Sequence, residues 1–293
     1  MRVSIGVTNY SWPGGTPGLG SELAQLVRGA DQAGVDTVWV VDHLLQADPT
    51  AAPDDTEMLE AYTTLGFLAA QTERVRLGTM VTGVTFRPPA LLVKAVTTLD
   101  VLSGGRAWLG LGAGYQGEEA EAMGLPLPPV AERFQRLEET LQIAARMWAG
   151  DDAPFEGKHY RLGRPVGSPL PTQRPGPPVL IGGTGERKTL RLVAQYADAC
   201  NLFDIPDGGR TVKHKLAVLA RHCADLDRRY EQIEKTLSSR LEAGESSDAF
   251  VRRCAAAAEL GIEHMVVITS GPWTTDALAT LAAAIPTIRQ AGP

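Results

Sequence analysis

Two glycine-rich segments and one histidine are the parts of this sequence best suited to bind a ligand and to move a proton. The first segment, RAWLGLGAGYQG, covers residues 106–117 and has glycines at positions 110, 112, 114 and 117. Glycine has no Cβ, so its backbone can approach a ligand closely or adopt a positive φ angle. The apolar residues 107–111 are typical of a strand buried on both faces. We therefore expect the segment to form a ligand-binding edge of a sheet.

Residues 112–117 also match the GxGxxG pattern of dinucleotide-binding sites. In those sites the last glycine lies in a long helix whose N-terminus binds the pyrophosphate. Here the helical pattern covers only residues 118–123, because Gly124 and three prolines follow it. The preceding strand is also the fourth in the chain, whereas the pattern belongs to the first strand of its domain. A Rossmann fold therefore stays the alternative fold.

The second glycine-rich segment is GGTG at residues 182–185, directly before a helix expected to begin near Arg187. Unpaired backbone N–H groups at a helix N-terminus attract anions, and Thr184 and Arg187 would add donors for a phosphate. A tight turn between a strand and a helix would use the same glycines. The first glycine cluster, on the preceding strand, favours phosphate binding over a simple turn.

His43 follows a second buried strand, residues 37–41, and is expected to face the open end of the sheet. Imidazole exchanges protons near neutral pH, so a catalytic or cofactor-contacting role is one interpretation. A histidine with purely structural hydrogen bonds is the other. Asp42 would either orient the imidazole ring or cap the following turn, and the sequence leaves both possibilities open.

Several other classes of chemistry lack the residues they need. The sequence has no His-x-His and its five histidines lie mostly on expected helices or loops, so we expect no metal site. No Gly-x-Ser-x-Gly motif for a serine hydrolase occurs, and the lysines avoid strand ends, which argues against a Schiff base. The strand ends offer glycines, one histidine and small polar groups. This pattern favours a cofactor that supplies its own reactivity.

The composition limits the partners and the location. The chain has 293 residues, 44% hydrophobic residues and a net charge of −6 with scattered basic residues, which argues against binding to nucleic acid or anionic membranes. No signal peptide or run of transmembrane length is present, so a cytoplasmic location is expected. Cys200, Cys223 and Cys254 match no metal-binding spacing and are expected to be buried free thiols.

Strands and helices are expected to alternate along the whole chain. The expected strands are residues 2–8, 37–41, 75–81, 107–111, 179–181, 199–203, 236–241 and 264–269. The expected helices are residues 21–34 with Ser21 as N-cap, 57–72, 87–103, 118–123, 130–148, 187–197, 211–230, 248–260 and 275–290. About eight strand–helix units predict a parallel (β/α)8 TIM barrel, formed by residues 1–293 as one domain.

One segment interrupts this alternation. Residues 151–178 contain seven prolines and no helical periodicity, which predicts an extended insertion between unit four and strand five, with a hairpin around residues 155–162. This insertion, together with the loops over residues 10–20 and 46–57, is expected to form the wall of the pocket. Tyr10 and Trp12 would contribute either an apolar wall or core packing.

Three segments resemble the luciferase-like monooxygenase superfamily, and more narrowly its branch of coenzyme F420-dependent oxidoreductases. They are VWVVDHL (residues 38–44), LGTMVTGVTFRPPALLVKAVTTLDVLSGGRAWLGLGAG (residues 77–114) and PVLIGGTGERKTLRLVAQYADACNLF (residues 178–203). The resemblance covers almost the whole chain in the right order, and it implies the (β/α)8 barrel.

The resemblance also implies roles for individual residues. It places a non-prolyl cis peptide between Met80 and Val81, behind the central ring of the cofactor, and His43 near the reactive carbon of that ring. It places residues 112–115 beside the ring or ribityl chain and residues 182–185 at the phosphate. Tyr115 and Glu118 depart from the glutamate and asparagine of a sugar-phosphate dehydrogenase in the superfamily. The same substrate should therefore not be assumed.

The functional prediction is an oxidoreductase that transfers hydride between coenzyme F420 and a small organic substrate, as a homodimer. Because no basic residues were identified for the polyglutamate tail of F420, an FMN-dependent monooxygenase using reduced flavin and O2 is the alternative, and a non-catalytic flavin-binding relative is a third possibility. His43 is the predicted catalytic residue. The predicted cofactor-binding residues are Asp42, Thr79, Met80, Val81, Gly112, Ala113, Gly114, Tyr115, Gly182, Gly183, Thr184, Gly185 and Arg187.

Overall fold

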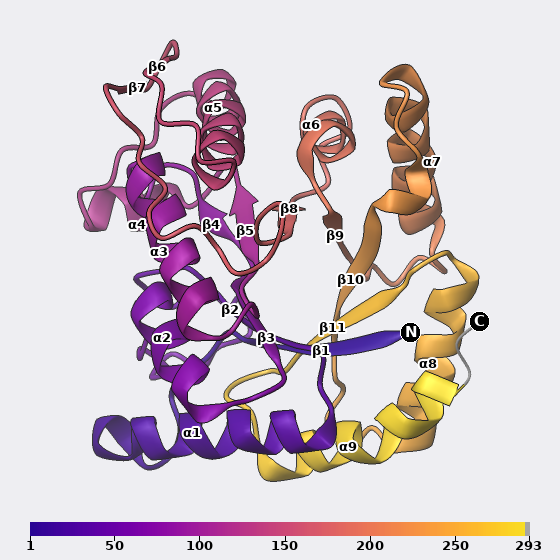
Figure 1. Cartoon of the computed structure of the whole chain (residues 1–293). Coiled ribbons are helices and arrows are strands. Elements are labelled where there is room, and N and C mark those ends of the chain that lie inside the picture. Colours follow the sequence, from indigo (N-terminus) through magenta and orange to yellow (C-terminus); the bar gives the residue numbers. More distant parts are fainter. Residues whose placement is uncertain (291–293) are drawn as a thin grey trace.

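The strands form a parallel barrel in the computed structural model, which describes residues 1–290 (Figure 1). Neighbouring strands pair in the order β3-β2-β1-β11-β10-β9-β8-β5-β4. The strands are β1 (Arg2–Val7), β2 (Thr37–Val40), β3 (Arg76–Thr79), β4 (Thr82–Gly83), β5 (Leu109–Gly112), β8 (Val179–Gly182), β9 (Ala199–Phe203), β10 (Glu234–Arg240) and β11 (His264–Ile268).

The barrel closes because β3 and β4 act as two parts of one strand. β4 pairs with β5, and a bridge between Leu77 and Ala107 joins β3 to the residues just before β5. The Leu77 N–H donates to Arg106 O, and the Trp108 N–H donates to Leu77 O, both at 2.8 Å. The described strands therefore occupy eight positions around the barrel, which confirms the predicted fold.

Helices cover the outer face of this barrel (Figure 1). They are α1 (Gly15–Ala33), α2 (Ala61–Gln71), α3 (Pro89–Leu102), α4 (Gly117–Ala122), α5 (Val130–Trp148), α6 (Thr189–Tyr196), α7 (Arg210–Asp225), α8 (Ser247–Glu259) and α9 (Thr275–Gln290), with a 3₁₀ helix, η1 (Tyr230–Gln232). Most residues of strands covered on both faces are apolar, as Val38, Trp39 and Val40 are in the fully buried β2.

Predicted ends of three helices differ from the structure by four to six residues. α2 begins at Ala61 instead of residue 57, because the Glu60 carboxylate caps the helix by accepting from the Thr63 N–H. α1 begins at Gly15, because Pro17 is tolerated in the first turn and Ser21 bonds the Gly18 carbonyl within the helix instead of capping it. α7 ends at Asp225 instead of Tyr230, and Asp227 adopts a positive φ of 52° that ends the helical path. Gly34, with φ 80°, ends the first helix as predicted.

The proline-rich segment between α5 and β8 contains the expected hairpin. β6 (Phe155–Glu156) pairs antiparallel with β7 (Arg161–Leu162). The Glu139 carboxylate of α5 accepts hydrogen bonds from the backbone N–H groups of Lys158, His159 and Tyr160 at 2.8–3.2 Å, which holds the hairpin on the helix. The status of the segment as an insertion stays a prediction, as does the assignment of the whole chain to one domain.

None of the helices described within residues 1–290 combines the length and the apolarity needed to cross a bilayer. The three cysteines are buried and free, as predicted. Burial raises the pKa of the Cys200 thiol to about 12. This thiol is therefore protonated at neutral pH and packs as a small apolar side chain.

Candidate active site

A cavity of about 570 Å³ lies at the C-terminal ends of the barrel strands. This is the end of a parallel barrel where enzymes place their active sites. Residues from every strand position line it. They include Thr8 after β1, Val40 of β2, Val81 between β3 and β4, Gly112 of β5, Gly182 of β8, Asn201 of β9, Arg240 of β10 and Ile268 of β11.

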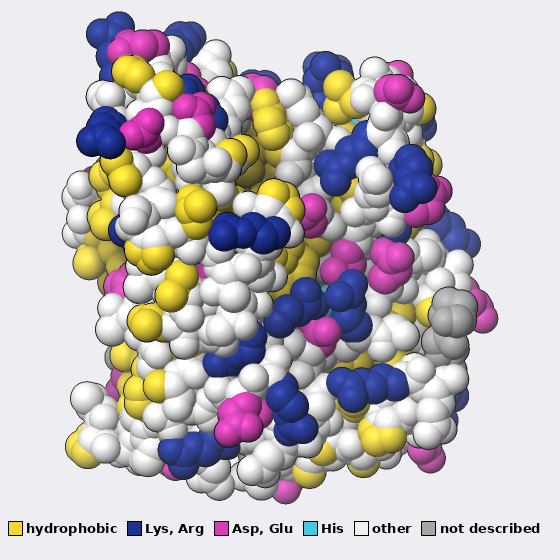
Figure 2. All heavy atoms as spheres, viewed as in Figure 1, with side chains coloured by type: hydrophobic (Ala, Val, Ile, Leu, Met, Phe, Trp, Pro, Cys, Tyr) yellow, Lys and Arg dark blue, Asp and Glu magenta, His cyan; other side chains and the backbone are white. Residues whose placement is uncertain are grey.

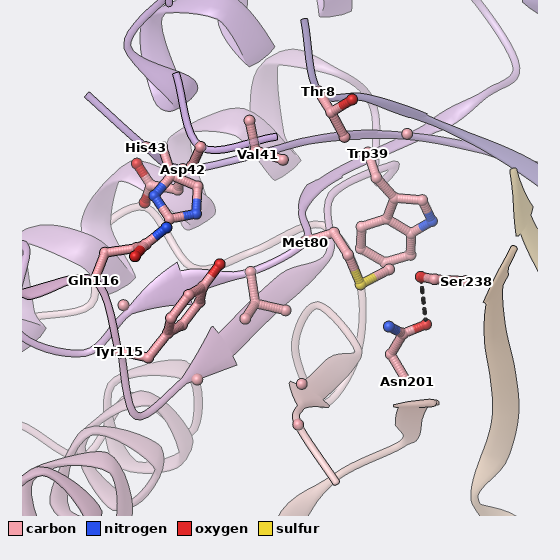
Figure 3. A pocket seen from close by; sticks show the side chains of 18 of the residues that line it. Thr8, Trp39, Val41, Asp42, His43, Met80, Tyr115, Gln116, Asn201 and Ser238 are labelled. Carbon is pink, nitrogen blue, oxygen red and sulfur yellow. Dashed lines mark hydrogen bonds between the residues drawn. The ribbon is translucent and has the colours of Figure 1, made fainter. Parts of the chain in front are cut away.

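Most of the predicted site residues meet in this cavity, although they come from distant parts of the chain. Those that line it are Asp42, His43, Met80, Val81, Gly112, Ala113, Gly114, Tyr115, Gly182 and Gly183. The structure does not bring Thr79, Thr184, Gly185 or Arg187 to the cavity lining. Figure 3 shows His43 and Tyr115 on one side, Asn201 and Ser238 on the other, and Met80 between them.

The predicted cis peptide between Met80 and Val81 is present. Val81 packs against two strands, since a Cβ on Gly112 or Gly182 would lie 2.8 or 2.9 Å from its Cγ2 atom. These two glycines therefore make room for Val81 at the mouth of the barrel. Position 110 requires glycine for a different reason: a Cβ there would lie 1.8 Å from the Thr79 carbonyl oxygen.

Thr79 lies behind this cavity wall. Its hydroxyl donates to the Gly110 carbonyl at 3.1 Å and lies 3.0 Å from the Thr82 hydroxyl. The Thr82 hydroxyl in turn bonds to the hydroxyl of Tyr62 at 2.8 Å. Thr79 thus holds β3 and β4 against β5, and its side chain faces away from the cavity.

His43 pairs with a glutamate that the sequence did not point to. Its Nδ1 atom lies 2.8 Å from Oε2 of Glu119 in α4, and 16% of its side chain is exposed. Its ring meets Tyr115 edge to face, with centroids 6.0 Å apart and an angle of 79° between the planes. Among residues 1–290, no protein group bonds to Nε2 of His43. This nitrogen is therefore free to exchange a proton with a ligand in the cavity.

Asp42 does not orient His43, and this possibility is now excluded. Arg87 binds the Asp42 carboxylate through both guanidinium NH2 groups, at 2.5 and 3.0 Å. The Asp42 side chain is fully buried, and Arg87 also pairs with Glu60 at 2.5 Å and stacks over the Tyr62 ring at 4.7 Å. Burial lowers the pKa of Arg87, but Asp42 and Glu60 outweigh it and raise the pKa overall.

The second glycine segment reaches the cavity through Gly182 and Gly183, as predicted, but the helix that follows reaches it through Thr189 instead of Arg187. α6 begins at Thr189 instead of Arg187, and the Thr189 side chain lines the cavity beside Gly183, whose φ is +109°. Arg187 is exposed to solvent. Lys188 lies over the ring of Phe134, 5.3 Å from its centroid, and Phe134 also lines the cavity.

The far side of the cavity holds polar residues that sequence reasoning missed. Arg240 pairs with Asp48 at 3.3 Å, and Thr8 donates to the same carboxylate at 3.1 Å. Asn201 Oδ1 accepts from the Ser238 hydroxyl at 3.1 Å (Figure 3). Thr8 was recognisable as a strand-end residue, and Asp48 lies in the loop over residues 46–57 that was expected to form the pocket wall. Asn201, Ser238 and Arg240 were missed because their inward orientation depends on the strand register.

A family model described as luciferase-like monooxygenase matches residues 1–265. The chain belongs to the luciferase-like monooxygenase family. The F420-dependent glucose-6-phosphate dehydrogenase of Kineococcus radiotolerans is 36% identical to it over 168 residues, which are 57% of this chain and 48% of that relative. The match to this luciferase-like protein thus spans about half the length of that curated relative.

Solved structures share the fold of this luciferase-like protein. An F420-dependent secondary alcohol dehydrogenase, in complex with an F420-acetone adduct, matches with a TM-score of 0.82 and 17% identity, covering 99% of this chain and 100% of that chain. A monooxygenase from Streptomyces bottropensis matches with a TM-score of 0.76 and 20% identity, covering 99% and 98%. At these identities the likeness establishes the barrel alone.

Proposed function

We propose that this luciferase-like protein is an oxidoreductase that transfers hydride between coenzyme F420 and a small organic substrate. The curated relative from Kineococcus radiotolerans is named as F420-dependent, and the sequence resemblance led to the same branch. The observation that carries the proposal is the free Nε2 atom of His43 in a cavity walled by Val81 and glycine backbone. Hydride transfer with a redox cofactor needs a proton-transfer group in the same cavity, and His43 would be that group.

The residues of the cavity fit such a cofactor. A flat deazaflavin ring needs an apolar wall, and Val81, Phe86, Ala113 and Phe134 supply apolar surface. The backbone at residues 112–114 would pack beside the ring, and Gly183 and Thr189 would face the phosphate. When bound, the deazaflavin supplies the carbon that exchanges hydride.

The protein would supply the proton transfer. His43 Nε2 would take a proton from the substrate or return one to it, and Glu119 would hold the imidazole ring in place. The Arg87–Asp42 pair would keep the Asp42 carboxylate away from the ring. Tyr115 would cover the open edge of His43.

Titration of the apoprotein with coenzyme F420, and separately with FMN, tests the cofactor through its fluorescence. Selective binding of F420 is the expected result. Selective binding of FMN, with oxygen uptake coupled to product formation, would replace the proposal by the monooxygenase alternative that the family description names. Binding of F420 without hydride exchange would indicate the non-catalytic relative. Binding of neither would overturn the assignment of the cavity as a cofactor site.

We also propose that the protein acts as a homodimer in the cytoplasm. Large apolar side chains are exposed on α2 and α3, and Figure 2 has hydrophobic side chains along the flank where these helices lie. They are Phe67, Leu91, Val101 and Leu102, and Leu102 is 75% exposed. Light scattering coupled to size-exclusion chromatography tests the dimer, and a monomeric mass would contradict it.

A further inference from the structure

We infer that Glu119 is a positioning residue that fixes the protonation pattern of the His43 ring, so that Nε2 faces the cavity without a hydrogen. The inference deepens the proposed function, because it assigns the neutral ring as a proton acceptor. A substrate with a hydroxyl group at the reacting carbon would then donate its hydrogen to Nε2.

The contacts of Glu119 leave one arrangement of hydrogens. Its Oε1 atom accepts from the backbone N–H groups of Leu44, at 2.6 Å, and Leu45, at 3.1 Å. Its Oε2 atom lies 2.8 Å from His43 Nδ1. A carboxylate can only accept hydrogen bonds, so Nδ1 must carry the hydrogen. In a neutral imidazole the other nitrogen, Nε2, then carries a lone pair.

The carboxylate is itself held rigidly. Glu119 is 5% exposed, and its two backbone donors come from the two residues that follow His43. Asp42, the carboxylate directly before His43 in the sequence, is bound by Arg87. Within residues 1–290, Glu119 is therefore the group that sets the hydrogen on Nδ1.

A change of one atom should invert the pattern. In a Glu119→Gln variant, the two backbone N–H groups require the amide oxygen at the Oε1 position, because an NH2 group there would face two donors. The amide NH2 group must then face His43 Nδ1 and donate to it. Nδ1 becomes the acceptor, and the hydrogen of the neutral ring moves to Nε2.

Nitrogen NMR of the apoprotein measures this pattern without any cofactor. In the wild type, above the pH at which the ring is protonated, we expect Nδ1 to carry hydrogen and Nε2 to be bare, with the His43 signals assigned by their loss in His43→Ala. In folded Glu119→Gln the two signals should exchange character. A wild-type spectrum with hydrogen on Nε2 would overturn the inference, even if the variant does not fold.

Glu234→Gln is the matched control, because Glu234 bonds Nδ1 of His264 at 2.7 Å and lies at the other end of the barrel. It should change the His264 signals and leave those of His43 unchanged. If the protein also turns over F420, Glu119→Gln should lower kcat by about 10²-fold, with a smaller change in KM. An unchanged kcat in folded Glu119→Gln would overturn the positioning role, whereas failure to bind F420 would overturn only the proposed function.

Discussion

Two histidine–glutamate pairs lie at opposite ends of the barrel and make the same contact. His43 follows strand β2, and its Nδ1 atom lies 2.8 Å from Glu119. His264 is the first residue of β11, and its Nδ1 atom lies 2.7 Å from Glu234. The difference is in the second nitrogen. Nε2 of His264 is bonded to the Ser4 hydroxyl and the residue is fully buried, whereas Nε2 of His43 lies open at the cavity.

The charged side chains around the two histidine–glutamate pairs also differ. At the base of the barrel, Arg2 lies 2.7 Å from Glu234, and Arg76 lies 2.5 Å from Asp36. Glu234 bonds Nδ1 of His264 and Ser4 bonds Nε2, so neither ring nitrogen of His264 is free. At the mouth, Arg87 is occupied by Asp42, and His43 keeps one free nitrogen. The residue type alone therefore does not indicate catalysis, whereas the unpaired nitrogen beside a cavity does.

The largest expected effect is the loss of turnover in His43→Ala. If His43 is a general acid or base, turnover should fall by about 10²- to 10⁴-fold. The melting temperature should change little, because the ring makes one hydrogen bond and faces the cavity. His264→Ala should show the reverse pattern, with a large loss of stability. Steady-state kinetics and thermal melting of both variants measure this, and unchanged turnover in His43→Ala would remove its catalytic role.

The Arg87–Asp42 ion pair beside the cavity should contribute more to the free energy of unfolding than the Arg76–Asp36 pair at the base of the barrel. Arg87→Ala leaves the fully buried Asp42 carboxylate unpaired and should lower the free energy of unfolding by about 3–5 kcal/mol. Arg76→Ala breaks a pair whose side chains are 24% and 21% exposed, so its cost should be smaller. Urea unfolding compares the two. Equal losses of unfolding free energy in the two variants would mean that the greater burial of Asp42 does not strengthen its ion pair.

The packing around Val81 gives a third test at the mouth. Gly182→Ala places a Cβ 2.9 Å from Val81 Cγ2, and this overpacking should destabilise the protein by about 1–3 kcal/mol. Adding Val81→Ala should recover part of the loss. Gly20→Ala in α1, where nothing lies within 4 Å of the new Cβ, is the control and should be neutral or stabilising. Additive losses in the double variant would exclude the proposed contact.

The smallest expected effect is the pH dependence of stability at the base. Burial is the largest influence on the pKa of Glu234 and raises it, but His264, Arg2 and Arg76 together lower the pKa below its usual value of 4.5. A depressed carboxyl pKa stabilises the folded state above that value, and the contribution is lost as the pH falls below it.

Wild-type stability should therefore fall more steeply than that of Glu234→Gln between about pH 5 and pH 3, by on the order of 1 kcal/mol. Chemical unfolding at each pH measures the difference. Parallel curves for the two proteins would show that Glu234 does not stabilise the base through its charge.

Local patterns in the sequence determined the barrel and the glycine framework of the site. The helix over residues 130–148 and the strand over residues 199–203 have the predicted bounds, because their apolar spacing and flanking residues act within a few positions. His43 and the glycines at 112, 114, 182 and 183 were recognised because they lie at or just after the ends of buried strands. The cis peptide was predicted from the resemblance to the family, not from the local sequence pattern.

Only the tertiary structure decided the partners of these residues. Glu119 is 76 residues from His43, and Arg87 is 45 residues from Asp42, so their contacts depend on how the barrel closes. The inward direction of Asn201 and Arg240, and the outward direction of Thr79, depend on strand register. Sequence periodicity reports which face of an element is buried. It does not report which distant donor meets which acceptor, and in this protein that pairing separates the histidine at the cavity from the one in the base.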